Sequence, residues 1–399
     1  MSGRIFITGI GITSAIGMDV ASSLDSLIKM RHGMTLPTFL PTRHADFHVG
    51  EVKASNNELC TILEMKKNFP VSRTTLLGCV AGAEAIAMSG IKPETIRNEL
   101  HFINGTSVSA MDISEKAFQK MIGGESVDYQ RWFSRHDCGK TTDFISEYLG
   151  FKNLTTTIST ACSSGANSIM QAGRNIKHGV YDLALAGGTD ALSLFTLNGF
   201  NSLKILDKDW CKPFDIDRKG LNLGEGAAYL LLESEKSILK TGSKPLAELA
   251  GFGNANDAYH QTASSPEGIG ATLAMQKAFE TSAIKPGSID YINAHGTGTE
   301  NNDHSESIAI RNVFGDKTPA YSSTKAYTGH TLAAAGALEA VISVLAIREN
   351  LVFPNLNLDT PIDIIGAPVL KLENKAVNTV LSNSFGFGGN CTSLIFRTV

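Results

Sequence analysis

Cys162 lies where the sequence changes from the period of a strand to the period of a helix. Residues 154–160 alternate with period two, and small and apolar residues then recur at helical spacing, at Ala166, Ile169, Gly173 and Ile176. A thiol at a helix N-terminus lies near the positive end of the helix dipole, which favours the nucleophilic thiolate. The pattern therefore predicts a catalytic cysteine, against the alternative of a buried structural one.

Three further segments contain residues able to do chemistry. They are NAHGTGT with His295, SSTKAYTGH with Lys325 and His330, and the Gly-Phe segment SNSFGFGG. Taken singly, each also fits a plain structural role: a satisfied histidine, a surface lysine and a tight turn. A metal site using His295 and His304 is disfavoured by their spacing and by the Asn and Thr residues around them, so we expect no metal.

The composition excludes several classes of protein. The chain has 399 residues, 42% of them hydrophobic, a net charge of −4 and 7% aromatic residues, so it holds a large core and shows no sign of a nucleic-acid partner. Its six cysteines form no CxxC pair, which argues against a zinc site or a disulfide framework and favours the cytoplasm. We find no signal peptide and no apolar run of 18 residues, and we expect no membrane insertion.

The elements that must position these residues alternate along the chain. We expect a buried strand at 4–12, a helix rich in small residues at 72–89, a helical excursion at 111–150 and a long helix at about 330–348. The glycines of KPFDIDRKGLNLGEGA are interpreted as tight backbone packing, because no phosphate-binding pattern accompanies them. Strand–turn–helix units with a reactive residue at the turn occur in both halves, at Cys162 and near His330, which favours a layered α/β fold.

Taken together, the motifs identify a family. TACSSG, NAHGTGT, STKxxxGH and SNSFGFGG, in this order, resemble the β-ketoacyl-acyl-carrier-protein synthases of the elongating, synthase II-like type, and the resemblance extends from Arg4 to Phe396. It implies the α/β thiolase-type fold, with two βαβαβαββ halves forming a five-layer αβαβα core. We expect the halves to be 1–245, with the nucleophile, and 246–399, with both histidines and the Gly-Phe loop.

The resemblance also implies a role for each motif residue. Cys162 would accept the acyl chain as a thioester, His295 and His330 would complete a Cys-His-His triad, and Glu306 would pair with the motif lysine, Lys325. The amides of Cys162 and Phe387 would form the oxyanion hole, with Phe387 as a gate and Phe385 beside it. The remaining residues would hold the pantetheine arm (Thr297 and Thr299) and line the acyl pocket (Val108 and Met111).

The implied reaction is a decarboxylative Claisen condensation with malonyl-acyl-carrier protein. Loss of carbon dioxide leaves an enolate that two imidazoles stabilise, so no cofactor is required. We expect His330, at the start of a helix, to stay neutral because of the helix dipole. The implied partners are an acidic acyl carrier protein, with Lys66, Lys67 and Arg73 as candidate docking cations, and a second copy or a related subunit of a heterodimer.

The sequence departs from the usual synthase pattern. Asn167 stands where a histidine is common, GGTN reads GGNC and brings Cys391 to the site, and Ala333 replaces a glycine. These departures suggest a specialised synthase, from a polyene or polyketide pathway, and fatty-acid biosynthesis stays open as the other pathway. Two alternatives remain: a degradative thiolase using Cys391 as acid/base, and a non-catalytic, chain-length-determining subunit, against which Cys162 and both histidines argue.

Overall fold

The computed structural model describes residues 3–66, 71–128, 134 and 136–399. In the N-terminal half, five strands lie in the order β3-β2-β4-β5-β1. β2 is parallel to β3 and β4, whereas β5 is antiparallel to β4 and β1. The strands are β1 (Ile5–Ser14), β2 (His101–Gly105), β3 (Thr155–Ile158), β4 (Leu183–Asp190) and β5 (Gly226–Ser234).

The C-terminal half repeats this topology. Its strands lie in the order β8-β7-β11-β12-β6, with β7 parallel to β8 and β11 and with β12 antiparallel to β11 and β6. A short antiparallel pairing between β1 and β6 joins the two halves. The strands are β6 (Ala247–Asn256), β7 (Tyr291–Asn293), β8 (Ala320–Ser322), β11 (Thr379–Phe385) and β12 (Asn390–Arg397). The chain is therefore a duplicated α/β fold, as the sequence predicted.

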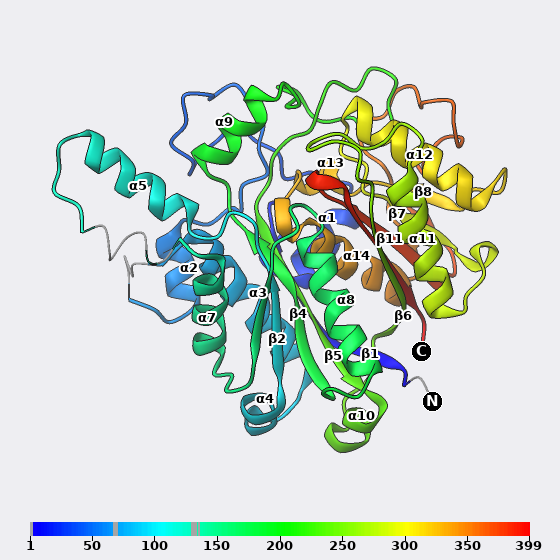
Figure 1. The fold of residues 1–399 in the computed structure, drawn as a ribbon, viewed down its shortest axis with the longest axis horizontal. Helices are drawn as coiled ribbons and strands as arrows, with labels where there is room; N and C mark the ends of the chain where they lie inside the picture. Colours follow the sequence, from blue (N-terminus) through cyan, green and yellow to red (C-terminus); the bar gives the residue numbers. More distant parts are fainter. Residues whose placement is uncertain (1–2, 67–70, 129–133, 135) are drawn as a thin grey trace.

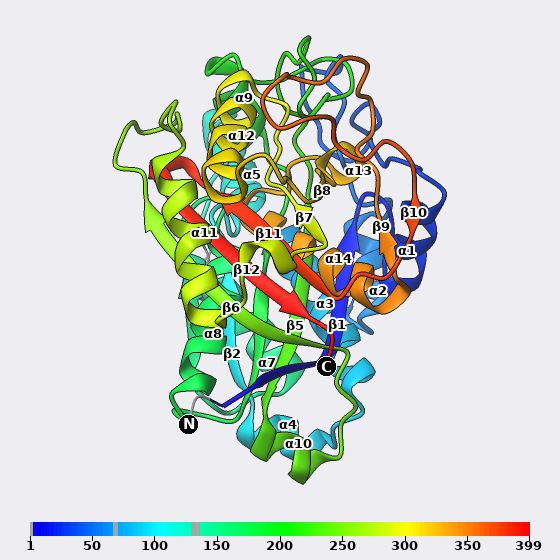
Figure 2. The ribbon, with the colours of Figure 1, turned by 90° about the vertical axis from the view of Figure 1, so that its right-hand side faces the viewer.

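Helices complete the layers, as Figures 1 and 2 show. α8 (Ser164–Lys177) and α14 (Ala335–Glu349) pack on each other between the two groups of strands. The outer faces are covered by α3 (Arg73–Ser89) and α7 (Cys138–Leu149) on the N-terminal half, and by α11 (Ile269–Ser282) and α12 (Glu300–Phe314) on the C-terminal half. The order of layers is thus helix, sheet, helix, sheet, helix.

The remaining elements connect or cover these layers. The helices are α1 (Val20–Ile28), α2 (Asn56–Ile62), α4 (Pro93–Glu99), α5 (Met111–Ile122), α9 (Leu194–Ser202), α10 (Glu235–Thr241) and α13 (Lys325–Thr328). Short 3₁₀ turns lie at Pro286–Ser288, Leu332–Ala334 and Phe387–Gly389, and β9 (Leu351–Val352) pairs with β10 (Glu373–Asn374). Among the described residues no single helix is long and apolar enough to cross a membrane, and the one pair that passes together, α3 with α4, is bent by 118°.

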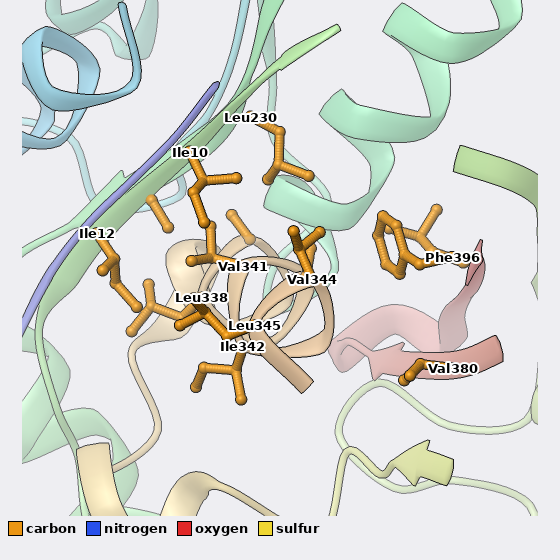
Figure 3. Packing of buried hydrophobic residues seen from close by; sticks show 14 of the residues in the cluster. Ile10, Ile12, Leu230, Leu338, Val341, Ile342, Val344, Leu345, Val380 and Phe396 are labelled. Carbon is orange, nitrogen blue, oxygen red and sulfur yellow. The ribbon is translucent and has the colours of Figure 1, made fainter. Parts of the chain in front are cut away.

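The central helix α14 explains how the two halves share one core. It is apolar on all sides except for Glu339, Ser343 and its last residues, and Ala335–Ile347 is buried throughout, as expected of a helix with protein on every face. Its side chains Leu338, Val341 and Leu345 belong to the same cluster as Ile10 of β1 and Phe396 of β12 (Figure 3).

Small residues bring α3 against β1 as the sequence predicted. A Cβ added at Gly9 or Gly11 would lie 2.1 Å from the carbonyl oxygen of Ala85 or 2.0 Å from that of Ala81. The glycine cluster before β5 has the same explanation, because a Cβ at Gly224 would lie 2.3 Å from the carbonyl oxygen of Thr328. These glycines permit backbone contact rather than phosphate binding.

The helix expected from about residue 330 begins later. A 3₁₀ turn at Leu332–Ala334 precedes α14, and Leu332 has a φ of 53°, which no continuous right-handed helix allows. His330 therefore lies in a turn, one short segment before the helix. The segment before β5 holds the backbone of His330, because the His330 amide donates to the carbonyl of Asn222 and the His330 carbonyl accepts from the amide of Gly224.

Arg73 is a structural residue, not the docking cation expected from the sequence. Its buried guanidinium forms an ion pair with Glu225 at 2.6 Å and also donates to the carbonyls of Val52 and Ala54. Because Arg73 and Glu225 are both buried, the guanidinium is not available to bind another protein.

Replacing Arg73 with leucine is expected to destabilise the fold strongly. The Glu225 carboxylate would lose its counter-ion in a buried position, and breaking a buried ion pair from one side costs about 3–5 kcal/mol. Chemical denaturation should show this loss as a lower midpoint. A free energy of unfolding within about 1 kcal/mol of the wild type would contradict the assignment.

Candidate active site

The turn between β3 and α8 presents Cys162. Ala161, directly before it, has a φ of 51°, an uncommon conformation for a residue other than glycine. Ser164 holds this turn, since its hydroxyl donates to the carbonyl of Ala161 at 2.6 Å and accepts from the amide of Thr160 at 2.8 Å. The predicted strand–turn–helix around the cysteine is thus confirmed, with the strain placed next to the nucleophile.

The protonation state of Cys162 differs from the expected one. Burial raises the pKa of the Cys162 thiol to about 11, and the Lys325 charge and the amide of Phe387 offset this effect only in part. A thiolate favoured by the helix N-terminus is therefore wrong for the resting protein, because desolvation outweighs the helix dipole. At neutral pH the sulfur rests as a thiol.

The two candidate histidines face each other from different elements. His295 follows β7 and His330 follows α13; both are buried, and their rings lie 5.5 Å apart at 87°. Nδ1 of His330 accepts from the amide of Leu332 at 3.2 Å, and Nδ1 of His295 lies 3.0 Å from Nζ of Lys325. With each Nδ1 facing a donor, the proton of a neutral ring is assigned to Nε2.

Both imidazoles stay neutral for a reason other than the expected one. Burial lowers the pKa of His330 well below its ordinary value, with the charge of Lys325 as the second cause, and the same causes lower the pKa of His295. The helix dipole is not needed, since α14 begins five residues after His330. Two neutral Nε2–H donors result.

Lys325 pairs with Glu339, not with Glu306 as the resemblance implied. Its ammonium bonds the carboxylate of Glu339 on α14 and donates to the carbonyl of His295 at 2.5 Å. Glu306 on α12 instead accepts from the amides of His295 and Gly296 at 2.9 and 2.8 Å, and from the side chain of Asn383. Glu306 thus holds the backbone of the His295 turn, whereas Glu339 neutralises the lysine.

The buried carboxyls predict how stability depends on pH. Burial raises the pKa of Glu339 from 4.5 to about 7, against the opposing effect of Lys325. The folded protein therefore keeps this proton to a higher pH than the unfolded chain does. The resulting stabilisation is fully present below about pH 4.5 and is lost as the pH rises through about 7.

We expect the wild type to lose thermal stability between about pH 4.5 and 7 more steeply than Glu339→Gln does. Glutamine keeps an oxygen for Lys325 but does not titrate, and every other titrating group, the histidines included, is common to both proteins. Melting temperatures measured across this range check the expectation. Parallel curves for the two proteins would refute it.

The Gly-Phe loop lies against the nucleophile. The amides of Phe387 and of Cys162 itself lower the pKa of the Cys162 thiol and so favour its charged form. Phe387 stacks on Phe200 with ring centroids 5.5 Å apart, and Phe385 is buried beside His295 at 5.7 Å. These two amides are the candidate donors of an oxyanion hole, and Phe387 lines the cavity beside Cys162.

A cavity of about 510 Å³ joins most of the predicted site residues. Its wall contains the cysteine, both histidines, both phenylalanines and both threonines of the prediction, together with a second cysteine (Cys162, His295, His330, Phe385, Phe387, Thr297, Thr299 and Cys391). Thr297 and Thr299 lie with their hydroxyl oxygens 2.9 Å apart. Lys325, Glu306 and Glu339 act from behind this wall.

Two predicted pocket residues do not line this cavity. Val108 packs against the cluster of Leu192 and Leu197, and Met111 is the first residue of α5. The resemblance placed them in the acyl pocket, but in this structure their segment contacts other parts of the N-terminal half.

Basic residues that the sequence did not single out lie at the cavity wall. Lys204 and Lys219 are exposed and Arg218 is half-buried, with its guanidinium donating to the carbonyls of Thr299 and Glu300. Of the cations expected to dock a carrier protein, Lys66 is exposed, and Lys67 lies outside the described residues.

Sequence reasoning missed two acidic residues that organise the site. Glu339 is the lone acid within the buried stretch of α14, and such a charge requires a buried partner, so a signal was present. Asp190 ends β4 and accepts from the amides of Val108 and Ala333 and the hydroxyl of Thr106. Among the residues that the structure describes, no group of three or more histidine, cysteine or acidic side chains is arranged to hold a metal ion.

Comparisons with known proteins agree over the whole chain. Models of the beta-ketoacyl synthase N-terminal and C-terminal domains match residues 2–237 and 246–359. The 3-oxoacyl-[acyl-carrier-protein] synthase 2 of Staphylococcus aureus (strain COL) is 33% identical, over 99% of this chain and 98% of the relative. The enzyme of the same name from Coxiella burnetii is 32% identical, over 99% of each.

Solved structures give the same result. The ishigamide ketosynthase/chain length factor superimposes with a TM-score of 0.94 at 30% identity, and all of both chains is covered. A ketosynthase from Xenorhabdus doucetiae, solved in complex with its chain length factor, has a TM-score of 0.86 at 32% identity, with 100% of this chain and 98% of that chain covered.

Proposed function

This chain belongs to the beta-ketoacyl synthase family, and on that premise we propose how its residues carry out the reaction. It is an acyltransferase of the 3-oxoacyl-acyl-carrier-protein synthase type, and its substrates are thioesters on the phosphopantetheine of an acyl carrier protein. No free cofactor takes part. The roles of the individual residues are our proposal.

In the first step the acyl group moves from the carrier to Cys162. The sulfur attacks the thioester carbonyl, the new carbon–sulfur bond forms, and the pantetheine sulfur leaves and takes up the proton that the Cys162 thiol gives up. The amides of Cys162 and Phe387 receive the negative oxygen of the tetrahedral intermediate, and one such donor contributes about 3–4 kcal/mol to the transition state. One thiol is consumed and one released, so no external acid is required.

In the second step malonyl-carrier protein loses carbon dioxide. The electrons of the broken carbon–carbon bond form an enolate, and the Nε2–H groups of His295 and His330 donate to its oxygen. The enolate carbon then attacks the Cys162 thioester, and the pair of electrons of the breaking carbon–sulfur bond returns to the sulfur, which takes up one proton from solvent. The buried cavity keeps water from hydrolysing the acyl-enzyme.

The arrangement of the two histidines carries this proposal. Each ring has its Nδ1 directed at a donor, the amide of Leu332 or the ammonium of Lys325, so each presents Nε2–H to the cavity that Cys162 also lines. A hydrolase that uses histidine as a general base needs an unprotonated nitrogen beside its nucleophile. Two neutral donors suit enolate stabilisation instead.

The comparisons support the condensing enzyme and not the alternatives of a thiolase or a non-catalytic subunit. We propose further that the protein serves a specialised polyene or polyketide pathway, which the likeness to the ishigamide ketosynthase/chain length factor supports. A ketosynthase-like second subunit, either another copy or a chain-length factor, is the proposed dimer partner. The division at residues 245 and 246 and a cytoplasmic location also belong to the proposal, the latter supported by six free cysteines.

The experiment is a loading assay with a panel of acyl-carrier thioesters that differ in length and unsaturation. Each is incubated with the protein and malonyl-carrier protein, alone and with a candidate chain-length factor, and the carrier products are weighed by mass spectrometry. We expect 3-oxoacyl-carrier products two carbons longer than the loaded chain, with polyunsaturated chains preferred. Extension of saturated chains only would refute the specialised pathway, and no extension under any condition would refute the synthase.

A further inference from the structure

A network of asparagines lies behind the nucleophile and is not part of the chemistry described above. Asn167 on α8, Asn254 on β6 and Asn390 at the start of β12 meet beneath the turn that carries Cys162. Oδ1 of Asn390 accepts from the side chains of Asn167 at 2.8 Å and Asn254 at 2.9 Å. Both Asn167 and Asn390 occupy positions at which the sequence departs from the usual pattern of its family.

The buried Asn167 uses all the hydrogen-bonding capacity of its amide. Its Nδ2 donates to Oγ1 of Thr160 and to Oδ1 of Asn390, each at 2.8 Å, while its Oδ1 accepts from the side chains of Thr392 at 2.7 Å and Asn254 at 3.1 Å. A histidine, common at this position in relatives, has only two nitrogens and no oxygen, so it cannot make these four bonds. The network therefore requires an amide at residue 167.

Asn390 also closes the loop that carries the Phe387 amide. Its carbonyl accepts from the amide of Gly386 at 2.8 Å. This bond joins the two ends of the loop from Gly386 to Gly389. Its side chain accepts from the hydroxyl of Ser163, the residue after Cys162, at 2.8 Å. At the other base of the loop, the hydroxyl of Ser384 donates to the carbonyl of Cys162 at 3.1 Å.

The contact between this loop and the nucleophile turn is close. A Cβ at Gly386 would lie 2.8 Å from the carbonyl oxygen of Thr160 and 3.2 Å from the amide nitrogen of Cys162. The two amides of the oxyanion hole thus come from separate segments. Backbone bonds from Gly388 to Gln261 and from Asp257 to Gly389 hold the far side of the loop, and the side-chain bonds of Asn390 and Ser384 join it to the nucleophile turn. Oxyanion stabilisation requires both donors at hydrogen-bond distance from one oxygen.

We propose that Asn390, held by Asn167, is a positioning residue that fixes the Phe387 amide relative to Cys162 and thereby sets the oxyanion stabilisation. The inference rests on the proposed function, since it assumes that Cys162 is acylated. The network acts on the tetrahedral intermediate rather than on the bound substrate. Its loss should therefore lower kcat with little change in KM.

The test compares two reactions of Cys162. Acylation from an acyl-carrier thioester passes through an oxyanion, whereas alkylation by iodoacetamide displaces iodide at a saturated carbon and forms none. Asn390→Leu and Asn167→Leu keep the side-chain size and remove the hydrogen bonds. Asn175→Leu is the matched control, because Asn175 lies on the same helix two turns away and its side chain bonds Gln171 and Tyr181, outside the network.

For both network variants we expect single-turnover acylation to slow by about 10²-fold, the effect that a 1 Å misplacement can have. The alkylation rate, divided by the thiolate fraction measured for each variant from its pH dependence, should stay within about twofold of the wild type. The double variant should be no slower than the worse single variant, because both break one network. Asn175→Leu should match the wild type in both reactions.

Two outcomes would overturn the inference. Acylation at the wild-type rate in Asn390→Leu would show that the loop is positioned without the network, and a parallel loss of acylation and alkylation would assign the network to the thiol or the fold. Both are distinct from failure of the proposed function, in which the wild type itself would be alkylated but never acylated.

Discussion

Replacing Cys162 with alanine is expected to abolish condensation, by more than about 10⁴-fold, and to leave no acyl adduct on the protein. The variant should nevertheless keep the decarboxylation of malonyl-carrier protein. His295 and His330 present their Nε2–H groups independently of the sulfur, so the enolate is still stabilised and is then quenched by a proton. Intact-mass spectrometry and release of labelled carbon dioxide measure the two effects.

Cys138→Ala is the matched control, since Cys138 starts α7 and does not line the cavity. This variant should acquire the same adduct as the wild type. An adduct that persists in Cys162→Ala would mean that another residue is the nucleophile. If the adduct then disappeared on mutation of Cys391, Cys391 would be the nucleophile and the assignment of Cys162 would be wrong.

Replacing either histidine with alanine is expected to separate acylation of Cys162 from decarboxylation of malonyl-carrier protein. His330→Ala and His295→Ala should still be acylated on Cys162, because the amides of Cys162 and Phe387 remain. Decarboxylation should fall by about 10²–10³-fold for each lost donor. Stopped incubations that quantify the acyl-enzyme and carbon dioxide in the same sample check both parts.

Asparagine serves as the graded control for His330. Its amide can donate a hydrogen bond from nearly the same place but cannot act as an imidazole base, so His330→Asn should retain more decarboxylation than His330→Ala. Equal loss in both variants would contradict the role of His330 as a neutral donor. Loss of acylation together with decarboxylation would instead assign His330 to the first step.

The fold and the residues that line the site were largely predictable from the sequence. Motif order placed Cys162, His295, His330 and Phe387 in one site, and the strand–turn–helix pattern around Cys162 agrees with β3 and α8. The strand–turn–helix inference succeeds because it depends on local chain geometry, whereas the grouping of the four residues was implied by the resemblance to the family. The duplicated strand order then brings the turn after β3 and the turn after β8 together, at the neighbouring N-terminal ends of α8 and α14.

The electrostatics of the site were not predictable in the same way. The thiolate expected at Cys162 and the neutral imidazole expected at His330 were each inferred from the dipole at a helix N-terminus. The pKa values of both groups depend instead on their complete burial. The carboxylate beside Lys325 belongs to α14, and a motif alone does not show which of two acids a buried lysine faces. Val108 and Met111 show a related limit of the sequence. Whether a residue lines the pocket depends on how its segment packs against the rest of the fold, and a motif does not show this.

The central claim is that an acyl chain on Cys162 is extended by decarboxylation, and a pulse-chase by intact-mass spectrometry tests it most directly. The wild type is loaded with an acyl-carrier thioester, freed of excess carrier, weighed, and then mixed with malonyl-carrier protein. We predict that the acyl mass leaves the protein and appears on the carrier with two added carbons, at a rate that follows carbon dioxide release. An adduct that persists, or that is released as a free acid, would contradict the account.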